Sequence, residues 1–265
     1  MFDPGVHQAL GLQRSKLHEG PLVLCVACPA FAEQGYEILC ELAAQINAAG
    51  RQAVVLDAHA CEAPLHQASP GKRWGLLHAL HDSSVVNVER GGSREDWLVL
   101  PAQQGIKTLQ ATARAGGARL AVSRLLAPFG SSVITLLYAP AQHIASLMGG
   151  MKATAVVPVV ADPQSCLDAY GAVKVLYHAG LSPALLPGAD KRSGYTESEL
   201  LTRVMSNVGE CAQRYLGHQV VAWPEQSWGH LALDQASSAA VNWGEHEPEE
   251  PVLGKFAVAG ATYWS

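Results

Sequence analysis

Residues 22–57, LVLCVACPAFAEQGYEILCELAAQINAAGRQAVVLD, decide the fold. The stretch opens with residues 22–27, an unbroken apolar run that is too short for a helix and typical of a central parallel strand. Apolar residues at helical spacing predict a helix from about residue 36 to 49, and residues 52–57 read as a second strand. The pattern predicts a β-α-β unit whose loop, residues 29–35, lies where such units bind ligands.

Strand and helix patterns go on alternating along the chain, which predicts one doubly wound α/β domain with a mostly parallel sheet flanked by helices. The further expected strands are 97–102, 133–138, 154–160 and 219–223, and the further expected helices are 74–80, 106–126 with a break at Gly116–Gly117, 163–179 and 197–216. We place this domain at residues 21–244. Residues 1–20 form an expected N-terminal helical extension, and residues 245–265 an acidic, proline-rich hinge with a C-terminal tail.

The amino-acid composition excludes several classes of protein. Apolar residues make up 49% of the 265 residues and charged residues 15%, which excludes a wholly disordered chain. The formal net charge of -5 argues against nucleic acid as a partner. Six cysteines without a repeated pair spacing indicate reduced thiols in a cytoplasmic protein. Apolar runs fall far short of the ~20 residues of a transmembrane helix, so no transmembrane segment is expected.

Residues 23–43 resemble the first strand, loop and helix of the MinD/ParA-like ATPases, where the loop reads GKGGVGKT and the helix carries N-L-A. The resemblance continues in order through four later segments. They are residues 75–80 (GLLHAL, resembling GLLDVL), 97–102 (WLVLPA, resembling a strand that ends in L-P-A), 136–140 (LLYAP, resembling I-I-D-T-P) and 156–165 (VVPVVADPQS, resembling V-V-T-T-P-E-P-T-S). The resemblance implies a P-loop NTPase-like fold of the SIMIBI/MinD type.

A segment ahead of the first strand narrows the resemblance. Residues 7–13, HQALGLQ, are similar to the D-Q-A-x-x-L-R segment of FlhG (FleN, YlxH), the MinD-like regulator of flagellar number and placement. In that family the segment docks as a helix on the GTPase FlhF. Gln8, Ala9 and Leu12 match the family pattern, whereas His7 replaces the Asp and Gln13 replaces the Arg. The resemblance implies that these five residues bind a protein partner.

The same alignment implies a vestigial nucleotide pocket. A phosphate-binding loop needs glycines, a lysine and a Ser or Thr hydroxyl. In the matching segment, residues 29–36 (PAFAEQGY), Gly35 replaces the lysine, Tyr36 the Thr and Ala30 the family's second lysine, and Pro29 enters the loop. A Glu33 carboxylate ~4 Å from a phosphate would oppose binding by up to about 4 kcal/mol at an effective dielectric near 20.

Two further motifs of the resemblance are altered. Asp57 remains from the Asp-x-Asp pair that ends the family's second strand, but His59 replaces the second acid. Tyr138 replaces the Asp that helps to hold Mg²⁺ in the family. These losses imply a pseudo-ATPase with no catalytic residues and no cofactor, ATP and Mg²⁺ included. We expect Tyr36, Phe31 and Tyr138 to occupy part of the space that the nucleotide would fill.

Two residue clusters allow a second interpretation. Cys25 and Cys28 form C-x-x-C, a redox or metal pattern, but their odd spacing sends them to opposite faces of a strand and favours structural thiols. Asp57, His59 and Cys61 could hold a transition metal on a continuing strand. A strand that ends and passes into a loop is favoured instead, so no metal is expected. His78 and His81 are expected to be exposed polar residues.

The sequence thus predicts a catalytically inactive, MinD/FlhG-like regulator or scaffold that acts by protein contact in flagellar assembly, number or placement, with FlhF as its partner. It is expected to be a monomer or a dimer that does not depend on nucleotide. Two alternatives remain open. One is a residual ATPase with a rebuilt loop, and the other is a localiser of a pilus or of a polysaccharide-synthesis machine.

Overall fold

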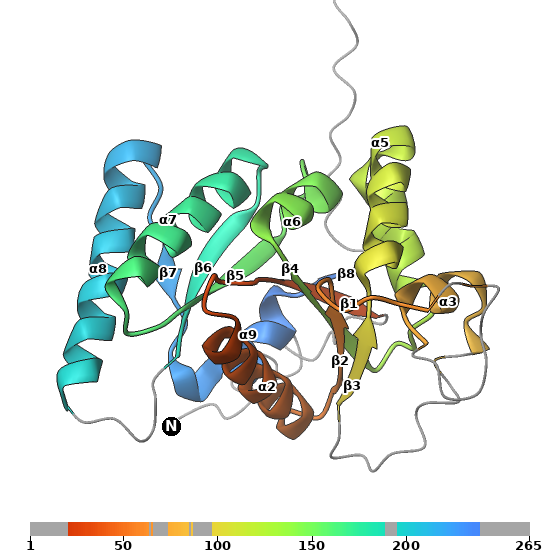
Figure 1. Ribbon diagram of the computed structural model, residues 1–265, viewed down its shortest axis with the longest axis horizontal. Coiled ribbons are helices and arrows are strands. Elements are labelled where there is room, and N and C mark those ends of the chain that lie inside the picture. The colour runs from red at the N-terminus through yellow and green to blue at the C-terminus, as the bar shows by residue number, and fades with distance from the viewer. Residues whose placement is uncertain are drawn as a thin grey trace, which may run out of the picture.

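The computed structural model of the chain describes residues 21–63, 65, 74–84, 86, 97–188 and 195–238 (Figure 1). The expected extension over residues 1–20 and the expected hinge and tail over residues 245–265 lie outside these ranges. No helix in the described part of the chain is long and apolar enough to cross a membrane.

Seven parallel strands form one sheet in the order β3-β2-β4-β1-β5-β6-β7. A short strand, β8, pairs antiparallel with the start of β1. The strands are β1 (Leu22–Ala27), β2 (Gln52–Asp57), β3 (Leu98–Pro101), β4 (Val133–Ala139), β5 (Thr154–Val159), β6 (Ser182–Pro187), β7 (Val221–Ala222) and β8 (Ser237–Ser238). The expected doubly wound, mostly parallel sheet is therefore confirmed.

Helices cover both faces of the sheet (Figure 1). Helices α2 (Ala32–Ala48) and α9 (Trp228–Gln235) pack on one face. The other face carries α3 (Leu76–His81), α5 (Gln103–Leu126), α6 (Ala141–Met148), α7 (Pro163–His178) and α8 (Tyr195–Leu216). Because side chains alternate along a strand, Val23, Cys25 and Ala27 lie in the second of these cores and Leu22, Leu24 and Val26 in the first. Burial on both faces explains the unbroken apolar run of β1.

Some elements have clear local signals and others do not. The break expected in α5 is present, since Gly117 adopts φ +83° there. Asp162 caps α7 as its Asp-Pro start predicts, and its side chain accepts a hydrogen bond from Gln164 N. The sequence reading missed α6, α9 and β6. Strand β6 was not predicted because its sequence, SPALLP, contains two prolines, which argue against a strand inside a sheet.

Candidate functional site

The candidate site lies at the carboxyl edge of the sheet, where β2, β4 and β1 end side by side. The register places Val26 of β1 and Asp57 of β2 on either side of Tyr138 in β4. Backbone hydrogen bonds continue the sheet beyond the strands, from Cys28 N to Ala139 O and from Ala58 N to Tyr138 O, each at 3.0 Å. The strand ends that the sequence assigned to a vestigial nucleotide pocket are therefore held rigidly together.

Helix α2 begins closer to β1 than the sequence predicts. The expected loop over residues 29–35 is wrong for its second half, because α2 begins at Ala32 and only residues 28–31 lie between the two elements. Gly35 N already donates a helical hydrogen bond to Phe31 O at 2.9 Å. Residues 32–34, Ala-Glu-Gln, are strong helix formers, and one glycine is too few to keep the segment out of a helix.

Two side chains pack against the first turn of α2 at Gly35. Gly35 is buried, and a Cβ built on it would lie 2.5 Å from Pro29 Cγ and 3.1 Å from the Tyr138 hydroxyl. The proline ring and the tyrosine thus pack directly on the helix backbone. Ala30, the residue at the family's second lysine position, is exposed at the turn between β1 and α2.

The aromatic rings of Tyr36, Tyr138 and His59 lie close together at this edge of the sheet. The Tyr36 and Tyr138 rings lie edge to face with centroids 6.3 Å apart, and the His59 ring lies 6.0 Å from that of Tyr138. Tyr138 is only 3% exposed, whereas Tyr36 stands half in solvent at 37%. Burial is the main cause that raises the pKa of the Tyr138 hydroxyl, and it also raises the pKa of Tyr36. Both phenols remain neutral donors at neutral pH.

His59 connects the ends of β2 and β1. Its Nε2 lies 3.0 Å from Cys28 Sγ, and its backbone N–H donates to Asp57 Oδ1 at 2.9 Å. Burial raises the pKa of the Cys28 thiol to about 11, a backbone hydrogen bond lowers it, and the Asp57 carboxylate adds to the rise. The thiol therefore keeps its proton at neutral pH and is a poor nucleophile despite its histidine neighbour.

The structure separates the residues of the two alternative clusters. Cys25 is buried in the core beneath α5, whereas Cys28 borders the core beneath α2, so the expected opposite faces are confirmed. Strand β2 ends at Asp57, and Cys61 turns away from His59 to donate to Gln103 Oε1 at 3.0 Å. No group of three His, Cys, Asp or Glu among the described residues could hold a metal ion.

The sequence reading missed Glu62, a buried carboxylate near the same edge. Its oxygens accept hydrogen bonds from Leu77 N at 2.6 Å, from Gly105 N at 3.0 Å and from Gln104 N. These donors belong to the first turns of α3 and α5, so one side chain caps two helices. Only the tertiary structure brings them together, since Glu62 lies 42 residues before Gln104.

His78 differs from its expectation. The sequence reading placed it with His81 as an exposed polar residue, but His78 is buried at 3% exposure, whereas His81 is exposed. Its Nδ1 accepts a hydrogen bond from Gly75 N at 3.3 Å, and its ring lies 5.5 Å from that of Trp74. The candidate partner-binding residues His7, Gln8, Ala9, Leu12 and Gln13 lie outside the described residues.

Comparison with known proteins shows the fold. No family model matches the chain, and no curated protein matches it. Apo McdA of Cyanothece is similar over 79% of this chain and 90% of that chain, at 16% identity and a TM-score of 0.50. An ATP complex of a Cyanothece McdA variant is similar over 82% and 88%, also at 16% identity and a TM-score of 0.50. A ParA family ATPase of Chlorobium tepidum matches over 82% and 89% at 12% identity and a TM-score of 0.43. The fold is that of the MinD/ParA P-loop NTPases.

Proposed function

We propose that this chain is a MinD/ParA-fold regulator that acts through protein contacts and does not use ATP as its switch. The observation that carries the proposal is the closed junction between β1 and α2. A phosphate-binding loop presents glycine backbone to the phosphates and a lysine to their charge. Here residues 32–35 are helical, and Pro29 and Tyr138 pack on Gly35.

Electrostatics support the same proposal. The first turn of α2 carries Glu33 and no basic residue, so its side-chain charge opposes an approaching phosphate. The helix N-terminus alone attracts anions, but such attraction is weak beside a fixed carboxylate. At the Mg²⁺-binding position of the family motif, the neutral Tyr138 phenol offers one oxygen in place of a carboxylate.

The partner proposal rests on the segment ahead of β1. Residues 7–13 share Gln8, Ala9 and Leu12 with the FlhF-binding segment of FlhG-like proteins and occupy the same place before the first strand. We therefore propose that the chain works in flagellar assembly, number or placement, and that FlhF is bound through this segment.

Calorimetric titration of ATP and ADP with Mg²⁺ into the full chain tests the nucleotide proposal. We expect no heat at about 1 mM nucleotide. Glu33→Gln removes the carboxylate from the first turn of α2, and Glu199→Gln on α8 is the matched control. Micromolar binding by the native chain, or binding that appears in Glu33→Gln alone, would show a nucleotide site that is open and merely repelled.

Titration of purified FlhF with GTP into the full chain tests the partner proposal. Gln8→Ala with Leu12→Ala should abolish binding, whereas Ser15→Ala, two residues beyond the segment, should keep it. Binding that survives the double substitution would remove the segment from the interface. A native chain that does not bind FlhF would contradict the flagellar role and favour a pilus or polysaccharide machine.

A further inference from the structure

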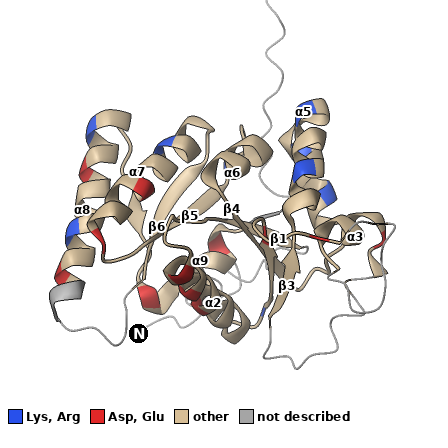
Figure 2. Ribbon diagram, in the orientation of Figure 1, with Lys and Arg blue, Asp and Glu red and all other residues tan. Residues whose placement is uncertain are grey.

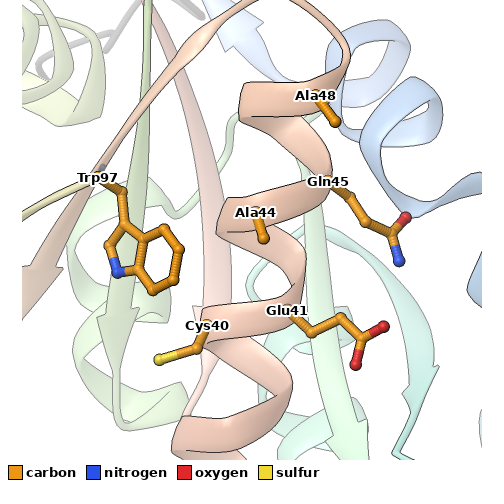
Figure 3. A pocket seen from close by; sticks show the side chains of 6 residues that line it. All are labelled: Cys40, Glu41, Ala44, Gln45, Ala48 and Trp97. Carbon is orange, nitrogen blue, oxygen red and sulfur yellow. The ribbon is translucent and has the colours of Figure 1, made fainter. Parts of the chain in front are cut away.

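The outer face of α2 carries a shallow groove of about 520 Å³ (Figure 3). Its lining comprises Cys40, Glu41, Ala44, Gln45, Ala48 and Trp97. The two alanines are exposed, and the cysteine and the tryptophan are half-buried. Such a combination of small helix residues beside an indole leaves room for the side chains of an approaching helix.

The flank of α2 toward α9 is closed, and the flank toward β3 is open. Gln45 donates from Nε2 to Glu225 O at 3.0 Å and accepts at Oε1 from Gly229 N at 3.2 Å. Gly229 packs so closely that a Cβ on it would lie 2.5 Å from Gln45 O. Tyr36, one turn before Cys40 on α2, and Val99, two residues after Trp97, are 37% and 36% exposed.

The charges on α2 indicate what kind of segment could bind in the groove. Helix α2 carries glutamates at every fourth residue, Glu33, Glu37 and Glu41, and no Lys or Arg between Ala32 and Ala48. Figure 2 shows these acidic positions along α2, in contrast to the basic positions along α5. An apolar groove beside an acidic row suits a helix that has one apolar face and basic residues next to it.

We infer that this groove is the docking site of the chain's own residues 6–17, held as a helix against α2. Their sequence, VHQALGLQRSKL, contains Arg14 and Lys16 and no acidic residue. Val6, Leu10 and Leu17 can share one side of that helix. Residues 6–17 would span about 18 Å as a helix, and α2 itself spans about 26 Å, so the segment fits along it.

The connection to the domain brings the end of the segment to the same edge of the sheet as the end of α2. Helix α2 runs antiparallel to β1, so the end of α2 at Ala48 and the start of β1 at Leu22 lie at the same edge of the sheet. Residues 18–21 join the segment to β1 and allow about 17 Å between Leu17 and Leu22 at full extension. A short tether of this kind supplies an effective concentration in the millimolar range, which populates even a weak contact.

This inference goes beyond the proposed function, because it holds or fails whether or not nucleotide or FlhF binds. On a helix docked through Val6, Leu10 and Leu17, Gln8 and Leu12 lie on the opposite side and face away from the groove. Docking would therefore present these two residues to a partner.

Alkylation of Cys40 in the full chain tests the docking. Cys40 lines the groove, so site-resolved mass spectrometry after iodoacetamide treatment reports whether the groove is covered. We expect Arg14→Glu with Lys16→Glu to raise the rate at Cys40 about tenfold, which corresponds to about 1.4 kcal/mol of lost docking energy. The rate at Cys61, an exposed thiol near the end of β2, should stay unchanged and is the internal control.

Charge reversal on the groove completes the test. Glu33→Lys with Glu37→Lys should restore protection of Cys40 in the chain that carries Arg14→Glu and Lys16→Glu. Burial and the Glu37 carboxylate both raise the pKa of Cys40, so the same two lysines in the native background provide the reference for their direct effect on the thiol. Equal rates in the native and reversed chains would overturn the inference. Protection that increases with protein concentration would also overturn it, because a second copy would then cover the groove.

Discussion

The first turns of α5 and α2 both lie near the carboxyl edge of the sheet, but different kinds of side chain contact them. At α5, the N–H groups of Gln104 and Gly105 donate to the Glu62 carboxylate, which also accepts from Leu77 at the start of α3. At α2, no side chain caps the helix, and Pro29 and Tyr138 pack against its first turn. The N–H groups at the start of α5 are thus hydrogen-bonded to a carboxylate of the chain itself, whereas the start of α2 is packed against a proline ring and a tyrosine ring.

The two starts show two ways in which the chain's own side chains occupy the beginning of a helix. Free N–H groups and the helix dipole favour negative charge at a helix start. Glu62 supplies that charge to α5 from inside the molecule, so an external anion would have to displace it. At α2, Pro29 and Tyr138 pack against Gly35, and Glu33 adds a carboxylate to the same first turn. Two substitutions and a pH titration test how these two helix starts differ.

Removal of Glu62 should have the largest effect. Glu62→Ala leaves three buried or half-buried N–H groups without their acceptor, at a cost of about 1–3 kcal/mol each, so we expect a loss of about 3 kcal/mol or more in the free energy of unfolding. Urea unfolding measures the loss, and Glu33→Ala, at the start of α2, is the matched control. A Glu62→Ala chain as stable as Glu33→Ala would show that the cap contributes nothing.

Filling the contact at Gly35 should have an intermediate effect. Gly35→Ala forces a Cβ against the Pro29 ring and should lower the free energy of unfolding by about 2 kcal/mol, as overpacking does. Gly171→Ala in α7 is the control, because nothing lies within 4 Å of its Cβ position and alanine should stabilise a helix interior there by up to about 1 kcal/mol. If both alanines stabilise the chain, the packing at the start of α2 is loose.

A pH titration tests the same edge through the half-buried thiol of Cys28. Burial raises the pKa of Cys25 from 9.0 to about 12 and that of Cys28 to about 11. Above pH 9 the unfolded chain therefore loses these protons before the folded chain does, so the free energy of unfolding should fall between pH 9 and pH 12 and be fully retained below pH 9. Urea midpoints at pH 8 and pH 10.5 measure the slope. Cys28→Ala should flatten it and Cys61→Ala should not; equal slopes would place the Cys28 thiol in water.

Much of the fold is readable because the signals are local. The apolar run of β1, the alternation of strands and helices, the Asp162 cap and the Gly117 break each depend on a few neighbouring residues. The helix start at Ala32 was misjudged, because the resemblance to a glycine-rich loop outweighed the helix-forming residues Ala32 to Gln34 themselves. Burial of His78 could not be predicted either, since a helix of six residues is too short to show a periodic apolar face.

A doubly wound parallel sheet follows from sequence patterns, because periodicity and turn chemistry act over short distances and agree along the whole chain. The contacts at the carboxyl edge of the sheet arise only when distant segments pack together. Glu62 reaches two helix starts, His59 reaches Cys28, and Tyr138 reaches Gly35 across elements far apart in the chain. Such contacts depend on strand order and packing in three dimensions, which no pattern of neighbouring residues specifies.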